Sequence, residues 1–129
     1  MDFYGDDLLL GTPAARELYA SVRDLPILDY HCHLDQFAIA RDDKFGDVGE
    51  LWLGADHYKW RAMRMCGVDE ELITGGAPMR DKFMAYAACM PRLAGNPLYY
   101  WTQLELKNIF GINEPLDSGS AADIYDRAN

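Results

Sequence analysis

Apolar residues recur along most of this chain at the three- and four-residue spacing of a helix. This period, with capping residues at the starts and glycine or proline at the ends, predicts the elements. Residues 1–11 are predicted to be an irregular lead-in. Helices are predicted over residues 12–23, 35–41, 47–53, 57–66, 78–90, 97–108 and 118–125, with a short helical turn at 69–72.

One short segment departs from the helical period. Residues 26–31 continue the apolar run Leu25-Pro26-Ile27-Leu28 and form the only predicted strand. An isolated strand cannot satisfy its backbone donors and acceptors, because those groups need neighbouring strands. The chain is therefore interpreted as the opening of a larger α/β protein, with a helical block inserted after its first strand.

The predicted strand leads into two histidines, His31 and His33. Successive strand side chains point to opposite faces, so the two histidines share one face with Asp29. Cys32 points to the other face, where we expect the core. Two imidazoles on one face can bind the same metal ion, and Asp29 could orient one of them. The alternative is a pair of ordinary, partly buried histidines; the one other histidine, His57, belongs to a different motif.

A second candidate site lies in residues 56–64. On a helix, His57, Arg61 and Arg64 fall on one side, which is the densest basic patch of the chain. Such a patch suits a small anionic ligand, because arginine binds carboxylates bidentately and a helix N-terminus adds positive potential. The competing interpretation is a solvated face whose arginines pair with nearby acids. Tyr58 either packs or, if it is buried near a charge, donates a proton.

A third stretch, residues 96–106, places aromatic side chains at helical spacing. This pattern is more typical of core packing than of a ligand site. We therefore interpret the predicted helix over these residues as structural.

Composition narrows the function classes. The chain has 129 residues, 50% of them hydrophobic, which suffices for one domain with its own core. Its net charge of -9 argues against nucleic acid or an anionic membrane as a partner. No apolar run approaches the roughly 20 residues of a membrane span. Three cysteines without a disulfide framework, and an acidic N-terminus where a secretory signal would be basic, indicate the reducing cytoplasm.

These stretches, in this order, resemble the uronate isomerase (glucuronate isomerase) family of the amidohydrolase superfamily. A lone His-x-His pair is a weak signal, whereas the ordered set is specific. The matching motifs are DYHCHL (29–34), LWL (51–53), DHYKWRAMR (56–64), GVDE (67–70), NPLYYW (96–101), LEL (104–106) and FGI (110–112).

The resemblance implies a fold and a set of site residues. The family fold is a distorted (β/α)8 TIM barrel, in which residues 1–34 would form an N-terminal helix and the first barrel strand. Residues 35–129 would be a helical insertion region, so this chain is mostly α. By resemblance, His31 and His33 bind a divalent metal, usually zinc. His57 and Tyr58 match the active-site dipeptide, with Tyr58 in proton transfer and His57 in catalysis and substrate binding. Arg61 is a weaker candidate for contacting the substrate carboxylate.

The resemblance also implies a reaction. It interconverts D-glucuronate with D-fructuronate and D-galacturonate with D-tagaturonate, as a proton moves between C2 and C1 through an enediol-like intermediate. The partner is a small uronate sugar, and we expect a homo-oligomer. Family members are several times longer, so the chain is interpreted as an N-terminal piece that is inactive alone. Relatives often carry histidines where this sequence has Tyr100 and Gln103, so neither is placed in the site.

Two other functions remain open at the level of sequence. One is a metal-dependent hydrolase of the same superfamily, in which the metal activates water. Residues 56–64 favour an isomerase over this hydrolase. The other is a non-catalytic helical module that binds a partner chain or oligomerises, with the predicted strand as an exposed edge.

Overall fold

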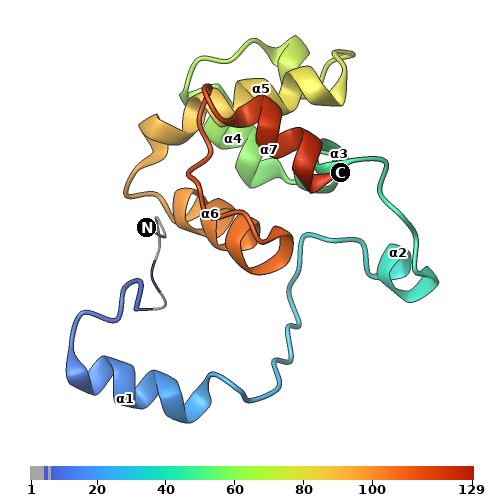
Figure 1. Cartoon of the computed structure of the whole chain (residues 1–129). Coiled ribbons are helices and arrows are strands. Elements are labelled where there is room, and N and C mark those ends of the chain that lie inside the picture. The colour runs from blue at the N-terminus through green and yellow to red at the C-terminus, as the bar shows by residue number, and fades with distance from the viewer. Residues whose placement is uncertain (1–4, 6) are drawn as a thin grey trace.

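The computed structural model describes residue 5 and residues 7–129, and the regular structure within them is helical throughout (Figure 1). The predicted lead-in over residues 1–11 lies partly outside the described residues. In chain order the elements are α1 (Pro13–Val22), α2 (Gln36–Arg41), α3 (Val48–Leu53), α4 (His57–Met65), η1 (Glu70–Leu72), α5 (Met79–Cys89), η2 (Met90–Leu93), α6 (Pro97–Phe110) and α7 (Ala121–Ala128).

Helix ends follow the local signals in the sequence. The Thr12 hydroxyl accepts a hydrogen bond from the Ala15 amide at 3.1 Å, and Pro13 takes the first position of α1. At the C-terminal end of α6, Gly111 adopts a φ of 68°, a left-handed conformation that glycine adopts without steric cost. The predicted helices are therefore confirmed, with bounds that shift by a few residues.

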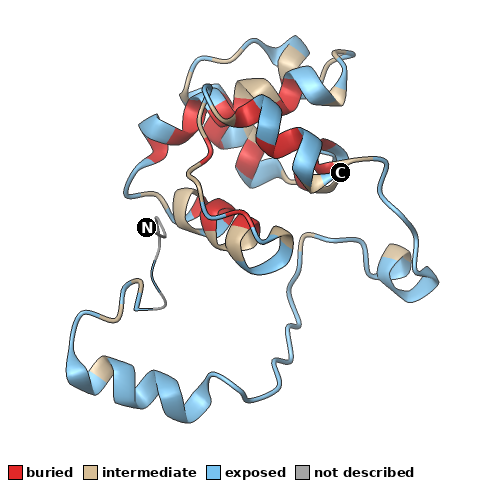
Figure 2. Ribbon diagram, viewed as in Figure 1, coloured by how far each residue is buried: buried red, intermediate tan, exposed pale blue. Residues whose placement is uncertain are grey.

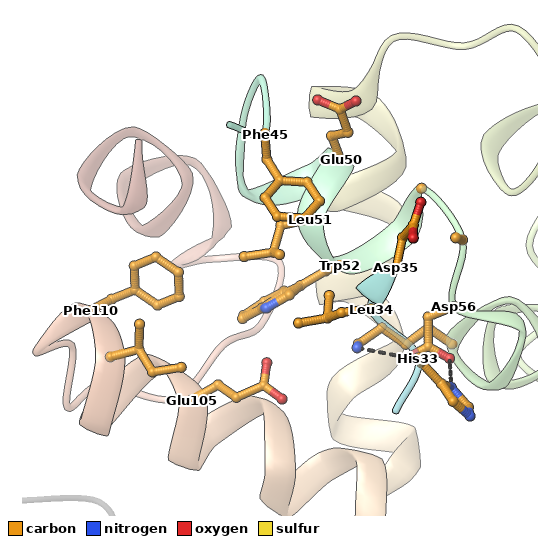
Figure 3. Close-up of a pocket in the computed structure, with 14 residues that line it drawn as sticks. His33, Leu34, Asp35, Phe45, Glu50, Leu51, Trp52, Asp56, Glu105 and Phe110 are labelled. Carbon is orange, nitrogen blue, oxygen red and sulfur yellow. Dashed lines mark hydrogen bonds and ion pairs between the residues drawn. The ribbon is translucent and has the colours of Figure 1, made fainter. Parts of the chain in front are cut away.

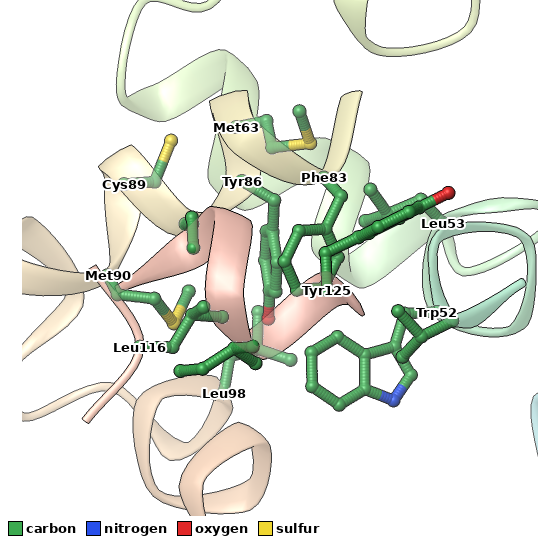
Figure 4. Packing of buried hydrophobic residues seen from close by; sticks show 14 of the residues in the cluster. Trp52, Leu53, Met63, Phe83, Tyr86, Cys89, Met90, Leu98, Leu116 and Tyr125 are labelled. Carbon is green, nitrogen blue, oxygen red and sulfur yellow. The ribbon is translucent and has the colours of Figure 1, made fainter. Parts of the chain in front are cut away.

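The core is built around α5, which packs against α3, α4 and α7 (Figure 4). Phe83 and Tyr86 are fully buried on this helix, and the Trp52 ring of α3 stacks 5.8 Å from that of Phe83. The Tyr86 hydroxyl shares a buried hydrogen bond of 2.8 Å with Thr102 of α6. The buried apolar residues, which recur at helical spacing on several helices, thus pack into one continuous cluster.

The strand predicted over residues 26–31 is wrong, since no strand occurs in the described part of the chain. The segment between α1 and α2 is irregular, and residues 24–28 are exposed and lie apart from the helical body (Figures 1 and 2). Only its later part, at His33, reaches the start of α4. Ile27 and Leu28 are 91% and 93% exposed. An apolar run favours a strand only where another strand pairs with it, and none does so among the described residues. The same absence of packing leaves Cys32 exposed, which corrects its predicted place in the core.

Two further features of the helices are the isolation of α1 from the core and the absence, in the described residues, of a membrane-spanning helix. No buried residue lies on α1, so this helix stands outside the apolar cluster in the structure. None of the described helices is both long and apolar enough to cross a lipid bilayer.

Trypsin is expected to cleave this chain after Arg23 well before it cleaves after Lys59 or Lys82. Arg23 is followed by an exposed segment without regular structure, whereas the two lysines are 9% and 5% exposed within helices. Mass spectrometry of a digestion time course measures the order of cleavage. Protection of the bond after Arg23 would contradict this expectation, and would favour pairing of the segment with another chain.

Candidate active site

Aromatic side chains from the irregular segment and from the start of α4 gather into one cluster. The His33 ring lies 4.9 Å from the His57 ring and 4.6 Å from the Tyr58 ring, measured between centroids. His57 and Tyr58 are 4.6 Å apart, and His31 lies 5.5 Å from His33. The structure thus brings together four of the five candidate site residues, all except Arg61. His33 and His57 meet in this cluster although they are 24 positions apart in the sequence.

Asp56 links the two stretches that form this cluster. Its Oδ1 accepts hydrogen bonds from the Tyr58 amide at 2.9 Å and from His33 Nδ1 at 3.2 Å. Its Oδ2 accepts from Lys59 Nζ at 2.9 Å. An ionised carboxylate only accepts hydrogen bonds, so the hydrogen in the His33 contact belongs to Nδ1. One side chain therefore caps α4 and holds an imidazole of the preceding segment.

The electrostatic surroundings keep Asp56 ionised. Burial alone would raise the pKa of Asp56, but the hydrogen bond and positive charge of Lys59 outweigh it, with help from His33 and the Tyr58 amide. The net result is a lowered pKa for this carboxyl. Asp56 is therefore a negatively charged acceptor at neutral pH, beside the ring cluster.

Two cavities flank the Asp56–Lys59 pair. One, of about 490 Å³, lies among α3, α4 and α6, and the side chains of Trp52 and Phe110 line it (Figure 3). The other, of about 460 Å³, is lined by His31, His33 and Tyr58 and by residues of α6. His33, Asp56, Lys59 and Glu105 line both cavities. The polar groups therefore lie where the two hollows meet.

Glu105 is the acidic group that α6 contributes to this region. Burial raises the pKa of its carboxyl, and the negative charge of Asp56 acts in the same direction, while Lys59 opposes both. Lys59 is itself 9% exposed. Lys59 is therefore the positive charge of this region, bonded to Asp56 and favouring the ionised form of Glu105.

The family model for Glucuronate isomerase matches residues 1–129. This chain belongs to the glucuronate isomerase family. The uronate isomerase of Streptococcus uberis is 50% identical over 129 residues, which is 100% of this chain and 28% of that protein. The uronate isomerase of Solibacter usitatus is 52% identical over 130 residues, with 100% and 28% covered.

Solved structures of the glucuronate isomerase family agree with this assignment. A uronate isomerase from Thermotoga maritima matches with a TM-score of 0.91 at 40% identity, over 98% of this chain and 28% of that one. A glucuronate isomerase from Caulobacter crescentus matches with a TM-score of 0.85 at 30% identity, over 96% and 28%. The chain thus spans little more than a quarter of the length of the relatives it matches.

The two arginines of the basic patch predicted on α4 have different surroundings in the structure. Arg64 forms an ion pair with Glu70, in agreement with the solvated-face interpretation. Arg61 instead lies over the Tyr58 ring, 5.7 Å from its centroid, beside a third cavity of about 310 Å³. The structure therefore separates Arg61, which borders the ring cluster, from Arg64, which does not.

The predicted orienting role of Asp29 is wrong. Its Oδ1 accepts from the backbone amide of His31 at 3.1 Å, a local turn contact rather than a bond to an imidazole. The carboxylate that does contact a predicted ligand histidine is Asp56, through His33 Nδ1. Asp56 is 23 residues from His33 along the chain, so no local pattern in the sequence linked the two.

The stretch 96–106 is only partly structural. Leu98, Thr102 and Leu106 are buried, but Trp101 is 54% exposed and borders the cavities near Tyr58. The prediction of an aromatic core stripe is thus wrong for Trp101. Glu105 was missed as a candidate as well; its carboxylate within an otherwise apolar helical stripe is the signal that could have found it.

His31 and His33 are the two side chains predicted to bind zinc. Two imidazoles bound to one tetrahedral zinc ion at about 2.0–2.1 Å have ring centroids roughly 5 Å apart. The centroids of His31 and His33 are 5.5 Å apart. The described residues contain no group of three or more His, Cys, Asp or Glu arranged to hold a metal. This separation is close to that of two ligands of one ion, and any further ligands would have to come from elsewhere.

Proposed function

We propose that this chain forms part of the active site of an isomerase that interconverts D-glucuronate with D-fructuronate and D-galacturonate with D-tagaturonate. A proton would move between C2 and C1 of the sugar through an enediol-like intermediate. The observation that carries the proposal is the convergence of His33, His57 and Tyr58, in a chain that matches the glucuronate isomerase family along its whole length.

The residues of the cluster suit distinct tasks in this reaction. A divalent metal such as zinc, held in part by His31 and His33, would polarise the oxygens at the reacting carbons. Tyr58 is 42% exposed at the edge of the cavities, so its hydroxyl can reach a bound sugar and transfer or share a proton. His57 stacks on His33 and can donate a hydrogen bond to a substrate hydroxyl.

Arg61 provides a positive charge for the sugar's carboxylate. Its guanidinium lies over Tyr58 and borders a cavity next to the ring cluster. Guanidinium groups bind carboxylates bidentately. We therefore propose that the sugar's carboxylate lies on the Arg61 side of Tyr58 and its reacting carbons on the His33 side.

A chimera tests this function. Residues 1–129 would replace the aligned segment of the Streptococcus uberis uronate isomerase, with which they share 50% identity. The chimera is expected to isomerise D-glucuronate with added zinc, whereas the 129-residue chain alone is expected to show no turnover, because the matched relatives are several times longer. An absorbance assay for the keto product measures both, and the unmodified relative is the positive control.

Two results would contradict the proposal. Turnover of D-glucuronate by the 129-residue chain alone would show that it holds a complete site. A folded chimera that hydrolyses a sugar lactone but isomerises no uronate would instead favour a metal-dependent hydrolase.

We further propose a cytoplasmic homo-oligomer for the protein that carries this segment. Large exposed apolar residues gather in the irregular segment and α2, among them Ile27, Leu28 and Phe37. Apolar groups at such density favour contact with another surface, which the remainder of a longer chain or a second subunit would supply. Light scattering on the chimera measures its oligomeric state, and a monomer would contradict the proposal.

A further inference from the structure

Asp56 makes more contacts than its position as a helix cap requires. A cap needs the hydrogen bond from the Tyr58 amide, at 2.9 Å. Asp56 also accepts from His33 Nδ1 at 3.2 Å and from Lys59 Nζ at 2.9 Å. The side chains of Asp56, His33 and Lys59 are 15%, 24% and 11% exposed, so these bonds are largely shielded from water. The two extra bonds join the histidine segment to α4.

We propose that Asp56 is a positioning residue that holds His33 in its Nδ1–H tautomer and fixes the orientation of its ring. The nitrogen left unprotonated is then Nε2, which is the one that would bind a metal ion. Histidines that bind metals usually donate their other ring N–H to a carboxylate or carbonyl in this way. The inference rests on the proposed function only for the ligand role of His33.

Lys59 makes this arrangement rigid. It occupies Oδ2 of Asp56, so Oδ1 is left facing both His33 and the first turn of α4. Because the same oxygen bonds the Tyr58 amide, His33 is held in register with the helix that carries His57 and Tyr58. The ring cluster therefore depends on one carboxylate rather than on apolar packing alone.

Asp56→Asn separates the positioning role from the cap. Asparagine and aspartate are about equally good helix caps. The amide, however, carries no charge and has one acceptor oxygen instead of two. If this oxygen stays on the Tyr58 amide and His33, it accepts a weaker hydrogen bond from Nδ1–H than a carboxylate does, and if it turns to Lys59 the bond from His33 is lost. Asp69→Asn is the matched control, since Asp69 is an exposed cap that accepts from the Glu71 amide at 2.9 Å.

The tautomer of His33 is measured in the metal-free chain of 129 residues by ¹⁵N NMR of the imidazole nitrogens. The spectrum is recorded at pH 8, where imidazole side chains are neutral. His33→Gln assigns the signal by its loss. The wild-type chain is expected to show Nδ1–H at His33, and Asp56→Asn is expected to shift it toward Nε2–H, with Asp69→Asn unchanged. A wild-type chain with Nε2–H at His33 would overturn the proposal before any variant is made.

Zinc affinity is measured by competition with a chelator in the chimera, because the further metal ligands would come from outside this chain. Asp56→Asn is expected to weaken binding about 10–100-fold, and Asp69→Asn to leave it unchanged. An unaltered tautomer in the Asp56→Asn chain, together with an unaltered zinc affinity of the Asp56→Asn chimera, would overturn the proposal. If the wild-type chain shows the Nδ1–H tautomer but the chimera binds no zinc, the contact between Asp56 and His33 is supported, and the metal role given under the proposed function is contradicted.

Discussion

Phe83→Ala is expected to lower the free energy of unfolding of this chain by about 3–5 kcal/mol. Phe83 is fully buried in α5, with the Trp52 ring 5.8 Å and the Tyr125 ring 5.2 Å from its own. The substitution removes apolar contacts to α3 and α7 together and leaves a cavity that their backbones cannot close. Urea denaturation followed by circular dichroism measures the change.

Phe37→Ala is the matched control, because it removes the same atoms from a ring that is 64% exposed on α2. Its effect on the free energy of unfolding is expected to stay within about 0.5 kcal/mol. Equal losses for the two variants would contradict the assignment of the core to α3, α5 and α7. A loss at Phe37 alone would place the stabilising contacts in the irregular segment and α2.

Tyr58→Phe is expected to lower kcat for D-glucuronate in the chimera by about 10²–10⁴-fold, the range typical of a group that transfers a proton. The phenylalanine keeps the ring contacts with His33 and His57 and with the Arg61 guanidinium, and removes only the hydroxyl. KM is expected to change little, because a proton-transfer group acts mainly in the transition state. Steady-state kinetics separate the two parameters.

Tyr19→Phe is the control for this variant. Tyr19 is 49% exposed on α1 and lies outside both cavities that flank Asp56. Its hydroxyl is therefore expected to be dispensable for turnover. A Tyr58→Phe chimera with unchanged kcat and raised KM would assign Tyr58 to substrate binding alone.

The helices of this chain could be predicted because their signals are local. A cap and its partner amide are two or three residues apart, as for Thr12 and Ala15 or Asp35 and Phe37. The irregular structure of residues 26–31 could not be predicted, because an apolar run such as residues 25–28 is equally compatible with a strand and with an unpaired segment. What decides between them is a neighbouring strand, which is absent among the described residues.

The candidate site shows the same division between local and distant information. His31, His33, His57, Tyr58 and Arg61 could be singled out from their motifs, and the structure gathers the first four into one ring cluster. Their motifs do not say which carboxylate serves which histidine. Asp29 is near in sequence but bonds a backbone amide, whereas Asp56 bonds the His33 ring across 23 positions.

By itself, the sequence determined the helical segments, the family and the set of candidate residues, because each depends on residue types at short and fixed spacing. Only the tertiary structure decided which of those residues meet. It placed Glu105 and Lys59 beside Asp56, paired Arg64 with Glu70, and left the predicted strand unpaired. The reason is physical: packing of α3 to α7 around one core fixes these distances, and such packing depends on the whole chain rather than on any single stretch.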